Sequence, residues 1–211
     1  MIVQGSPEWH ALRIGKVTAS RVADVIASTK TGGWGAARAN YAAELIAERL
    51  TGQPTQMFVN EAMRWGTETE PYARQAYCER FGCDVYETGF VDHPEIAMAG
   101  ASPDGLVGAY GLLEIKCPNT ATHLDMLLGG SIADKYVVQM QFQMACTGRG
   151  WCDFVSFDPR MPATMRLFVR RVEQDVSRIV KLESEVQRFL EEIDGNVRVL
   201  RERYEREAQA A

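Results

Sequence analysis

Ser102–Gly105 (SPDG) and Glu114–Pro118 (EIKCP) are the two stretches that decide the fold of this sequence. The glutamate of the second comes ten positions after the aspartate of the first. Between them, the glycines of Gly108–Gly111 fall between two short apolar runs. Glycine pairs with this spacing are typical of turns between paired strands. The segment therefore predicts a bent β-hairpin with an acidic residue at its entrance.

The charged residues of this hairpin predict a metal site. Side chains alternate along a strand, so Glu114 and Lys116 should share one face while Ile115 points into the core. Two carboxylates, from Asp104 and Glu114, can hold Mg²⁺, and a neighbouring lysine can orient or deprotonate water and steady phosphate charge. The alternative is a surface turn followed by a strand with an incidental charge pair. A charge pair on an otherwise apolar strand is costly to bury, which favours the site.

Length and composition predict one domain, residues 1–211, with a sizeable core. Hydrophobic residues make up 46% of the chain and charged residues 24%, as in ordinary globular proteins. No apolar run approaches the roughly 20 residues of a membrane span, and the first residues lead directly into polar sequence. We therefore expect a cytoplasmic protein without a signal peptide.

The cysteines predict reduced thiols. Their number is odd and none form a CxxC pair, which argues against a zinc site or an iron–sulfur cluster. The five are Cys78, Cys83, Cys117, Cys146 and Cys152.

The net charge of −5 and pI near 5.3 argue, taken alone, against a nucleic-acid-binding protein. A local channel lined with Arg and Lys can nevertheless coexist with an acidic exterior. Five basic residues and only two acidic ones fall within the first forty residues. The N-terminal segment is therefore the expected basic surface.

The pattern of apolar residues, caps and breakers predicts an α/β protein with a central mixed sheet flanked by helices. Ser6 is the expected N-cap of the first helix, and Pro71 is expected either to kink a helix or to start a new one. Helices are expected at 7–14, 21–27, 36–50, 60–81, 120–128 and 132–147. Strands are expected at 84–91, 96–99, 105–107, 112–117, 152–157 and 164–171.

The last predicted helix has an apolar residue every three or four positions, a stripe typical of core or of a subunit contact, against a coiled-coil partner site as the alternative. The stripe comprises Val172, Val176, Ile179, Leu182, Val186, Phe189 and Ile193.

Five motifs in a fixed order resemble those of the lambda exonuclease family, the YqaJ-type viral recombinases within the PD-(D/E)XK nucleases. They are Trp9–Ser20 (WHALRIGKVTAS), Trp65–Pro71 (WGTETEP), SPDG, EIKCP and Gln139–Gln141 (QMQ). Each is weak alone, but together they span nearly the whole chain.

The resemblance implies a PD-(D/E)XK nuclease-like fold and a hydrolase with 5′→3′ double-strand exodeoxyribonuclease activity. Such an enzyme is processive and Mg²⁺-dependent, releases 5′-mononucleotides and leaves 3′ single-stranded DNA. The family also implies a ring-shaped homotrimer around DNA ends and a single-strand annealing recombinase as its partner in phage recombination.

The resemblance further assigns catalytic roles residue by residue. Asp104, Glu114 and the carbonyl of Ile115 would hold metal, with two Mg²⁺ ions per site and Mn²⁺ as an alternative ion. Lys116 would position the attacking water. Glu70, on a helix, would complete the second-metal region, and Gln139 matches the family's glutamine near the active site.

The DNA contacts implied by the resemblance lie elsewhere. Arg13, Ser20 and Ser102 match the positions that bind the terminal 5′-phosphate, and a guanidinium with two hydroxyls suits a dianion. Met63 matches an apolar wedge between terminal bases, against a core methionine as the alternative. Lys30 matches a basic residue that reaches the duplex, against a solvated loop lysine. Trp9 by itself is expected to be a core residue or a hydrophobic staple.

Two other functions stay open. One is a PD-(D/E)XK endonuclease or repair nuclease, against which the expected phosphate pocket argues. The other is a DNA-end-binding recombination scaffold without activity, against which the complete set of expected active-site residues argues. The three histidines have no ligand spacing and are expected to be structural or exposed.

Overall fold

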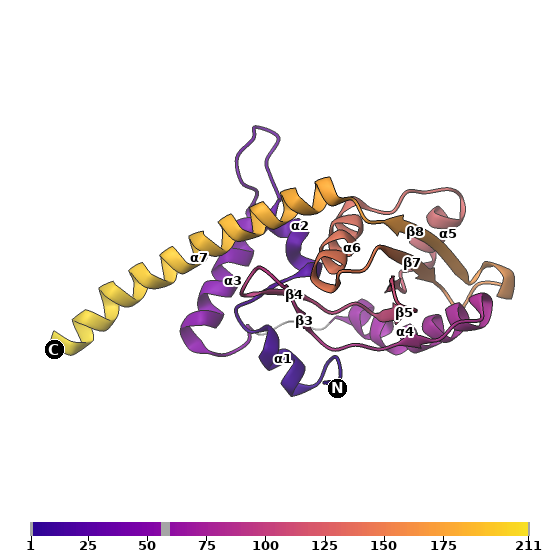
Figure 1. Ribbon diagram of the computed structural model, residues 1–211, viewed down its shortest axis with the longest axis horizontal. Coiled ribbons are helices and arrows are strands. Elements are labelled where there is room, and N and C mark those ends of the chain that lie inside the picture. Colours follow the sequence, from indigo (N-terminus) through magenta and orange to yellow (C-terminus); the bar gives the residue numbers. More distant parts are fainter. Residues whose placement is uncertain (1, 56–59, 211) are drawn as a thin grey trace.

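The computed structural model describes residues 2–55 and 60–210, and Figure 1 shows helices packed around a central sheet. This sheet has five strands in the order β2-β5-β6-β7-β8. β6 is antiparallel to β5 and parallel to β7, so the sheet is mixed. Its strands are β2 (Val85–Tyr86), β5 (Gly105–Val107), β6 (Gly111–Lys116), β7 (Trp151–Phe157) and β8 (Leu167–Glu173).

Seven α-helices are present in the described ranges, and most end where the sequence predicts. α3 and α4 stop at Gly52 and Gly82, both in the left-handed conformation that glycine adopts readily. Ser6 caps α1, as predicted, by accepting a hydrogen bond from the Trp9 amide. The helices are α1 (Pro7–Arg13), α2 (Val22–Val25), α3 (Ala36–Thr51), α4 (Glu61–Phe81), α5 (Thr120–Leu127), α6 (Asp134–Thr147) and α7 (Val176–Ala210).

The two faces of the central sheet pack against different helices, and this decides where β6 presents its charged residues. Leu113 and Ile115 point towards α4 and pack with a cluster that includes Tyr77. Leu112 points the other way and packs against Met140 of α6. Because the side chains of a strand alternate, the even-numbered residues of β6 all face α6.

A second sheet, in the order β1-β4-β3, supports the N-terminal helices. The main core lies between this sheet and helices α2, α3, α6 and α7. Three short strands build the sheet, β1 (Val17–Thr18), β3 (Val91–Asp92) and β4 (Ala99–Ala101). Because β1 follows α1 directly and pairs in parallel with β4, the N-terminal motif lies beside the hairpin.

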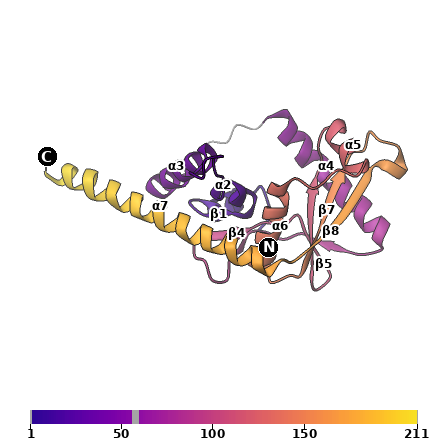
Figure 2. The same cartoon turned by 90° about the horizontal axis from the view of Figure 1, so that it is seen from above.

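From Ile179 to Ile193, the apolar stripe on α7 is part of the core, which confirms the prediction of a core stripe. Val172 belongs to β8 instead, and the Val176 side chain is 64% exposed, because the helix starts beyond the packed region. Past the core, α7 projects away from the body towards the C-terminus (Figures 1 and 2).

Several predicted boundaries are wrong for identifiable reasons. The segment 84–91 contains β2 and the start of β3, which belong to different sheets, and between them the carbonyl of Thr88 accepts a hydrogen bond from the Gln4 side chain at 2.9 Å. The predicted strand at 96–99 starts only at Ala99, because the His93 ring accepts hydrogen bonds from the amides of the preceding turn. Pro71 lies inside α4, so it does not start a new helix.

Short 3-10 turns account for two further differences. One precedes α2 at Ala19–Arg21, so that helix is shorter than predicted. The other, at Ala163–Met165, delays the start of β8. Among residues 2–55 and 60–210, no helix combines the length and hydropathy that crossing a bilayer requires.

Candidate active site

The hairpin of β5 and β6 fixes Asp104 at the end of the sheet. Its amide donates to the carbonyl of Leu113 at 3.1 Å, and its Oδ2 accepts from the amide of Ile115 at 2.6 Å. Gly105 is required next to it, since a Cβ there would lie 2.2 Å from the side chain of Val85. The backbone of β6 thus holds the Asp104 carboxylate in place.

Glu114 is fully buried and accepts three side-chain hydrogen bonds on the α6 face of the sheet. Lys116 donates to Oε1, and Gln139 donates to the same oxygen at 2.8 Å. Gln143 donates to Oε2 at 2.7 Å. A buried carboxylate needs such donors, because leaving it unpaired would be costly.

One cavity of about 160 Å³ brings most of the predicted site residues together. It contains seven of them, drawn from α1, the turn after β1, the hairpin and α6. Its lining residues are Gln4, Trp9, Arg13, Thr18, Ala19, Ser20, Ser102, Asp104, Glu114, Lys116, Gln139 and Gln143. The residues predicted for cleavage and those predicted to hold a terminal phosphate therefore share one space.

Burial and mutual repulsion control the charge of the carboxylates. Burial raises the pKa of Asp104 well above its usual range, and the negative charge of Glu114 raises it further. For Lys116, burial acts to lower the pKa, but attraction to Glu114 and Asp104 outweighs it, so the pKa is raised. Lys116 is therefore an ammonium group at neutral pH, which suits orienting water better than deprotonating it.

The donor set fits a divalent cation. Asp104 and Glu114 line the same cavity and repel each other, which a cation between them would relieve. Within the described ranges, no group of three or more His, Cys, Asp or Glu side chains is placed to hold a metal. Mg²⁺ needs no such group, because it keeps several waters and is bound by one or two carboxylates.

Glu70 lies outside the cavity lining, on the α4 side of the sheet. Its carboxylate pairs with Arg74, one helical turn away, at 2.6 Å. Burial raises the pKa of Glu70, opposed by the charges of Arg74 and Lys116. The structure thus places Glu70 within electrostatic reach of the site but engaged by Arg74.

The Arg13 guanidinium is the feature of the cavity that most clearly suits an anion. It lies 3.7 Å above the Trp9 ring and makes no side-chain hydrogen bond within the described ranges. Burial lowers the pKa of Arg13, with Tyr41 and Glu48 acting the other way, but a guanidinium stays charged at neutral pH. A half-buried guanidinium without a partner has free donors that an anion can accept.

The two predicted serines are held close to this guanidinium by the surrounding structure. Ser102 Oγ accepts a hydrogen bond from the Trp9 ring nitrogen at 2.9 Å. Ser20 Oγ lies 3.4 Å from Thr18 Oγ1 and is exposed. Both hydroxyls can still donate to a bound anion.

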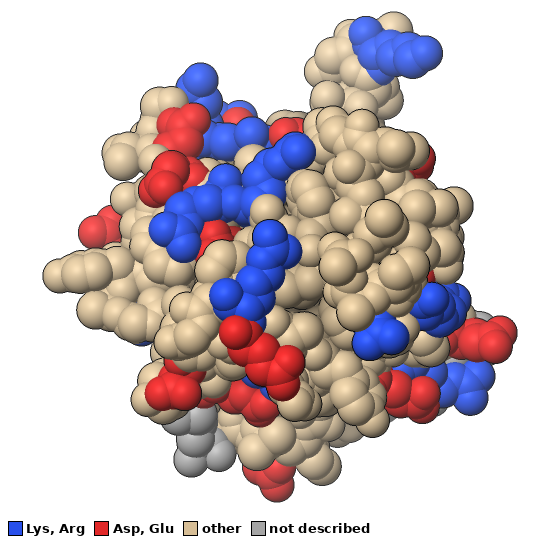
Figure 3. All heavy atoms as spheres, turned by 90° about the vertical axis from the view of Figure 1, so that its right-hand side faces the viewer, with Lys and Arg blue, Asp and Glu red and all other residues tan. Residues whose placement is uncertain are grey.

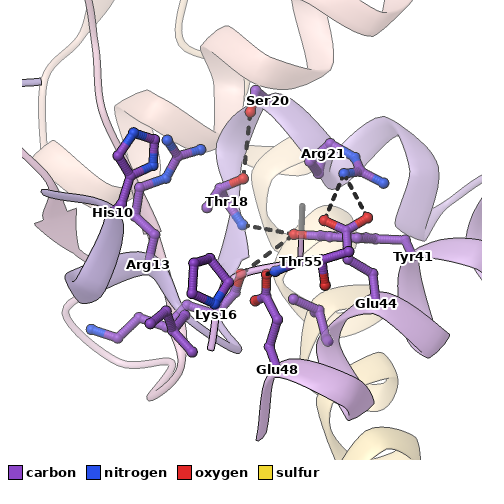
Figure 4. Close-up of a pocket in the computed structure, with 13 residues that line it drawn as sticks. His10, Arg13, Lys16, Thr18, Ser20, Arg21, Tyr41, Glu44, Glu48 and Thr55 are labelled. Atoms are coloured by element: carbon purple, nitrogen blue, oxygen red, sulfur yellow. Dashed lines mark hydrogen bonds and ion pairs between the residues drawn. The ribbon is translucent and has the colours of Figure 1, made fainter. Parts of the chain in front are cut away.

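A second cavity, of about 460 Å³, shares Arg13, Thr18 and Ser20 with the first. Figure 4 shows the residues that line this second cavity. The other arginine of this second cavity, Arg21, forms ion pairs with Asp24 at 2.6 Å and with Glu44 at 3.1 Å. Arg13 is thus the arginine of this cavity that is left without a carboxylate partner in the described chain.

Tyr41 anchors the wall between the two cavities. Burial raises its pKa to about 12, so its hydroxyl is neutral and accepts from the Thr18 amide at 3.2 Å (Figure 4). This bond fixes the turn that carries Ser20.

Met63 and Lys30 do not line either cavity. Met63 lies in the first turn of α4 with its side chain 42% exposed, which excludes the core-methionine alternative. Lys30 is exposed in the loop between α2 and α3. In Figure 3 this loop stands clear of the body with basic atoms at its tip, and basic side chains below it form a row flanked by acidic ones.

Three site residues were missed from the sequence. Gln143 follows Gln139 by four residues, a helical spacing that places both on one face of α6. Arg74 follows Glu70 by the same spacing. Trp9 is not simply core, because it supports both Arg13 and Ser102.

The histidines are structural or exposed as predicted; His123, for example, is buried and bonded to Ser156.

Comparisons with known proteins identify the family of the chain. Residues 8–150 match the YqaJ-like viral recombinase domain. The chain therefore belongs to this family, that of lambda exonuclease, as its motifs predict, and the predicted nuclease-like fold is confirmed.

Solved structures give more detail. LHK-Exo, an alkaline exonuclease from Laribacter hongkongensis, is 51% identical over 98% of this chain and 100% of its own, with a TM-score of 0.88. A structure of LHK-Exo in complex with dAMP matches at 52% identity, with the same TM-score and coverage. A phage-related exonuclease from Haemophilus somnus shares the fold at 17% identity and a TM-score of 0.62, covering 86% of this chain and 96% of its own. No curated protein matches the chain.

Proposed function

We propose that this chain is a Mg²⁺-dependent DNA exonuclease that digests one strand of duplex DNA from the 5′ end. The observation that carries the proposal is the shared cavity. It joins the cluster of Asp104, Glu114 and Lys116 to the unpartnered guanidinium of Arg13. A phosphate held at Arg13 would place the next phosphodiester towards the carboxylates.

Each residue then has a defined task. Asp104 and Glu114, with the carbonyl of Ile115, would hold the metal. When bound, Mg²⁺ activates the attacking water and stabilises the leaving oxygen. Lys116, as an ammonium group, donates a hydrogen bond that orients water, and Gln139 keeps Glu114 directed into the cavity. Glu70 would contribute to a second ion after releasing Arg74.

At the other end of the cavity, Arg13, Ser20 and Ser102 would hold the terminal 5′-phosphate. The new 5′-phosphate left by each cut would be drawn into the same pocket, which moves the strand forward by one nucleotide. Release of 5′-mononucleotides is consistent with the complex of the alkaline exonuclease relative with dAMP. Met63 would separate the terminal bases, and Lys30 would contact the duplex.

We further propose that residues 1–211 act as one cytoplasmic domain, in a ring-shaped homotrimer that works with a single-strand annealing recombinase in phage-type recombination. The chain carries a net charge of −5 and would repel DNA as a monomer. Three copies with their basic N-terminal segments inward would create a basic passage by repeating one interface.

Light scattering tests the assembly. We expect a mass near three chains, and digestion of long DNA that continues after an excess of competitor DNA is added. A stable monomer that remains processive would exclude the ring.

The activity is tested with linear duplexes that carry 5′-phosphate or 5′-hydroxyl ends, with and without Mg²⁺, beside a circular plasmid. We expect Mg²⁺-dependent digestion of the linear DNA, faster from 5′-phosphate ends, and no cutting of the circle. Cutting of the plasmid would favour the endonuclease alternative. Binding of ends without digestion would favour the scaffold.

A further inference from the structure

Gln143 is a buried side chain at the active site to which the proposed mechanism gives no role. It lies on α6, four residues after Gln139, and its relative exposure is 0%. Both glutamines donate to Glu114, Gln139 to Oε1 at 2.8 Å and Gln143 to Oε2 at 2.7 Å. The two amides therefore hold the two oxygens of one carboxylate from one face of the helix.

The chemistry of the contact fixes the orientation of the Gln143 amide. An ionised carboxylate only accepts hydrogen bonds, so the amide nitrogen must face Glu114 and Oε1 must face away. In that orientation Oε1 is buried and has no hydrogen-bond partner. A buried acceptor without a donor is costly unless a ligand or water supplies one.

The surroundings of Gln143 supply a place for that donor. Its side chain lines the same cavity of about 160 Å³ as Asp104 and Lys116, which has room for water. A divalent ion such as Mg²⁺ brings several waters with it, and each of them donates.

We infer that Gln143 is a positioning residue for the metal site: it fixes Glu114 through Oε2 and accepts, through Oε1, a hydrogen bond from water that accompanies the ion. The inference rests on the proposed function. It explains why the Gln143 amide is buried with its oxygen left without a hydrogen-bond partner.

Gln141 provides a matched control on the same helix. It is also buried, at 2% exposure, but it points away from the cavity. Its nitrogen donates to the carbonyl of Glu173 and its oxygen accepts from the amide of Asp175, both at 2.8 Å. Gln141 is thus fully satisfied by protein, whereas Gln143 is not.

The experiment compares Gln143→Met with Gln141→Met, since methionine keeps the approximate volume and removes the amide. The Mg²⁺ concentration for half-maximal digestion of a 5′-phosphorylated duplex is measured for each. Mg²⁺ binding in the absence of DNA is measured by titration calorimetry, and the melting temperature is measured in EDTA.

For Gln143→Met we expect the half-saturating Mg²⁺ concentration to rise about tenfold or more, the cost typical of losing a partner of a metal ligand. The calorimetric affinity should fall by the same factor, with most of the rate recovered at saturating Mg²⁺. Gln141→Met should show the reverse pattern, with a lower melting temperature and an unchanged Mg²⁺ requirement.

An unchanged Mg²⁺ requirement and affinity in Gln143→Met would overturn the inference. If Gln143→Met does not fold, Gln143→Ala is measured in the same way, and failure of both to fold would show a purely structural role. A wild-type protein that digests no DNA would instead contradict the proposed function, so the two failures are distinguishable.

Discussion

The two ends of the active-site cavity are built differently. At the sheet end, every oxygen of Glu114 is engaged by donors, and Asp104 is bonded to the β6 backbone. At the end formed by α1, the Arg13 side chain stacks on Trp9 but makes no hydrogen bond within the described chain, and Ser20 is exposed. The first end is organised without any ligand, whereas the second offers a cation and hydroxyls that a ligand could engage. This difference suits a site where chemistry needs fixed geometry and the DNA end must enter and advance.

Changes at the organised end should have the largest effect. Asp104→Ala and Lys116→Ala should each lower DNA digestion by about 10²-fold or more, because preorganised groups act directly on the developing charge. Digestion rates are measured with folding checked by circular dichroism, and Lys135→Ala, at an exposed position on α6, serves as the control. Near-normal digestion by a folded variant would remove that residue from the catalytic assignment.

At the end formed by α1, Arg13→Ala should abolish the preference for 5′-phosphate over 5′-hydroxyl ends more than it slows cleavage. Hydrogen bonds to charged groups contribute about 1.5–3 kcal/mol, so the preference should fall roughly 10- to 100-fold. The rates on both ends are compared with those of Arg188→Ala, which removes an arginine of α7 that pairs with Glu185. A preference retained in full by Arg13→Ala would place the phosphate pocket elsewhere.

A smaller change at Trp9 separates its two contacts at the Arg13 end of the cavity, the stacking with Arg13 and the hydrogen bond to Ser102. Trp9→Phe keeps an aromatic ring under Arg13 but loses the hydrogen bond to Ser102. One neutral hydrogen bond contributes about 0.5–1.5 kcal/mol, so the 5′-phosphate preference should fall roughly two- to tenfold. An effect as large as that of Arg13→Ala would mean that Trp9 is needed for the position of the arginine itself.

The sheet end should also make stability depend on pH when no metal is bound. The pKa of Asp104 is higher in the folded than in the unfolded protein. The protonated Asp104 therefore stabilises the fold fully below the ordinary carboxyl pKa, near 4. This stabilisation is lost as the pH rises through the pKa of Asp104 in the folded protein. The raised pKa of Lys116 contributes no loss in this range, because lysine titrates only at alkaline pH.

Mg²⁺ should offset this loss. Its addition should raise the melting temperature by a few degrees more at pH 8 than at pH 5. Melting curves with Mg²⁺ and with EDTA at both pH values measure the difference, and Asp104→Asn should reduce it. Equal effects of Mg²⁺ at the two pH values would mean that Asp104 does not respond to the ion.

Much of the sheet end could be predicted from the sequence. The hairpin motif is local, and strand alternation alone places Glu114 and Lys116 on one face, as the structure confirms. The link to Arg13 could be predicted only from the family resemblance, because the pairing of β1 with β4 that brings α1 to the hairpin joins segments about eighty residues apart. Gln143 was missed because a buried glutamine is informative only once its partner, Glu114, is known. Arg74 was missed because the sequence does not show that Glu70 is already paired.

The most direct test of the central claim follows release from both ends of one DNA. A linear duplex with a 5′-phosphate on one strand and a 5′-hydroxyl on the other, each labelled at its terminal nucleotide, is digested with Mg²⁺. We predict that labelled mononucleotide leaves the 5′-phosphorylated strand first, and that Arg13→Ala removes the difference between strands while Lys116→Ala stops release from both. Equal release from the two strands by the wild-type protein, or release that begins at 3′ ends, would contradict a cavity with a cleavage end and a 5′-phosphate end.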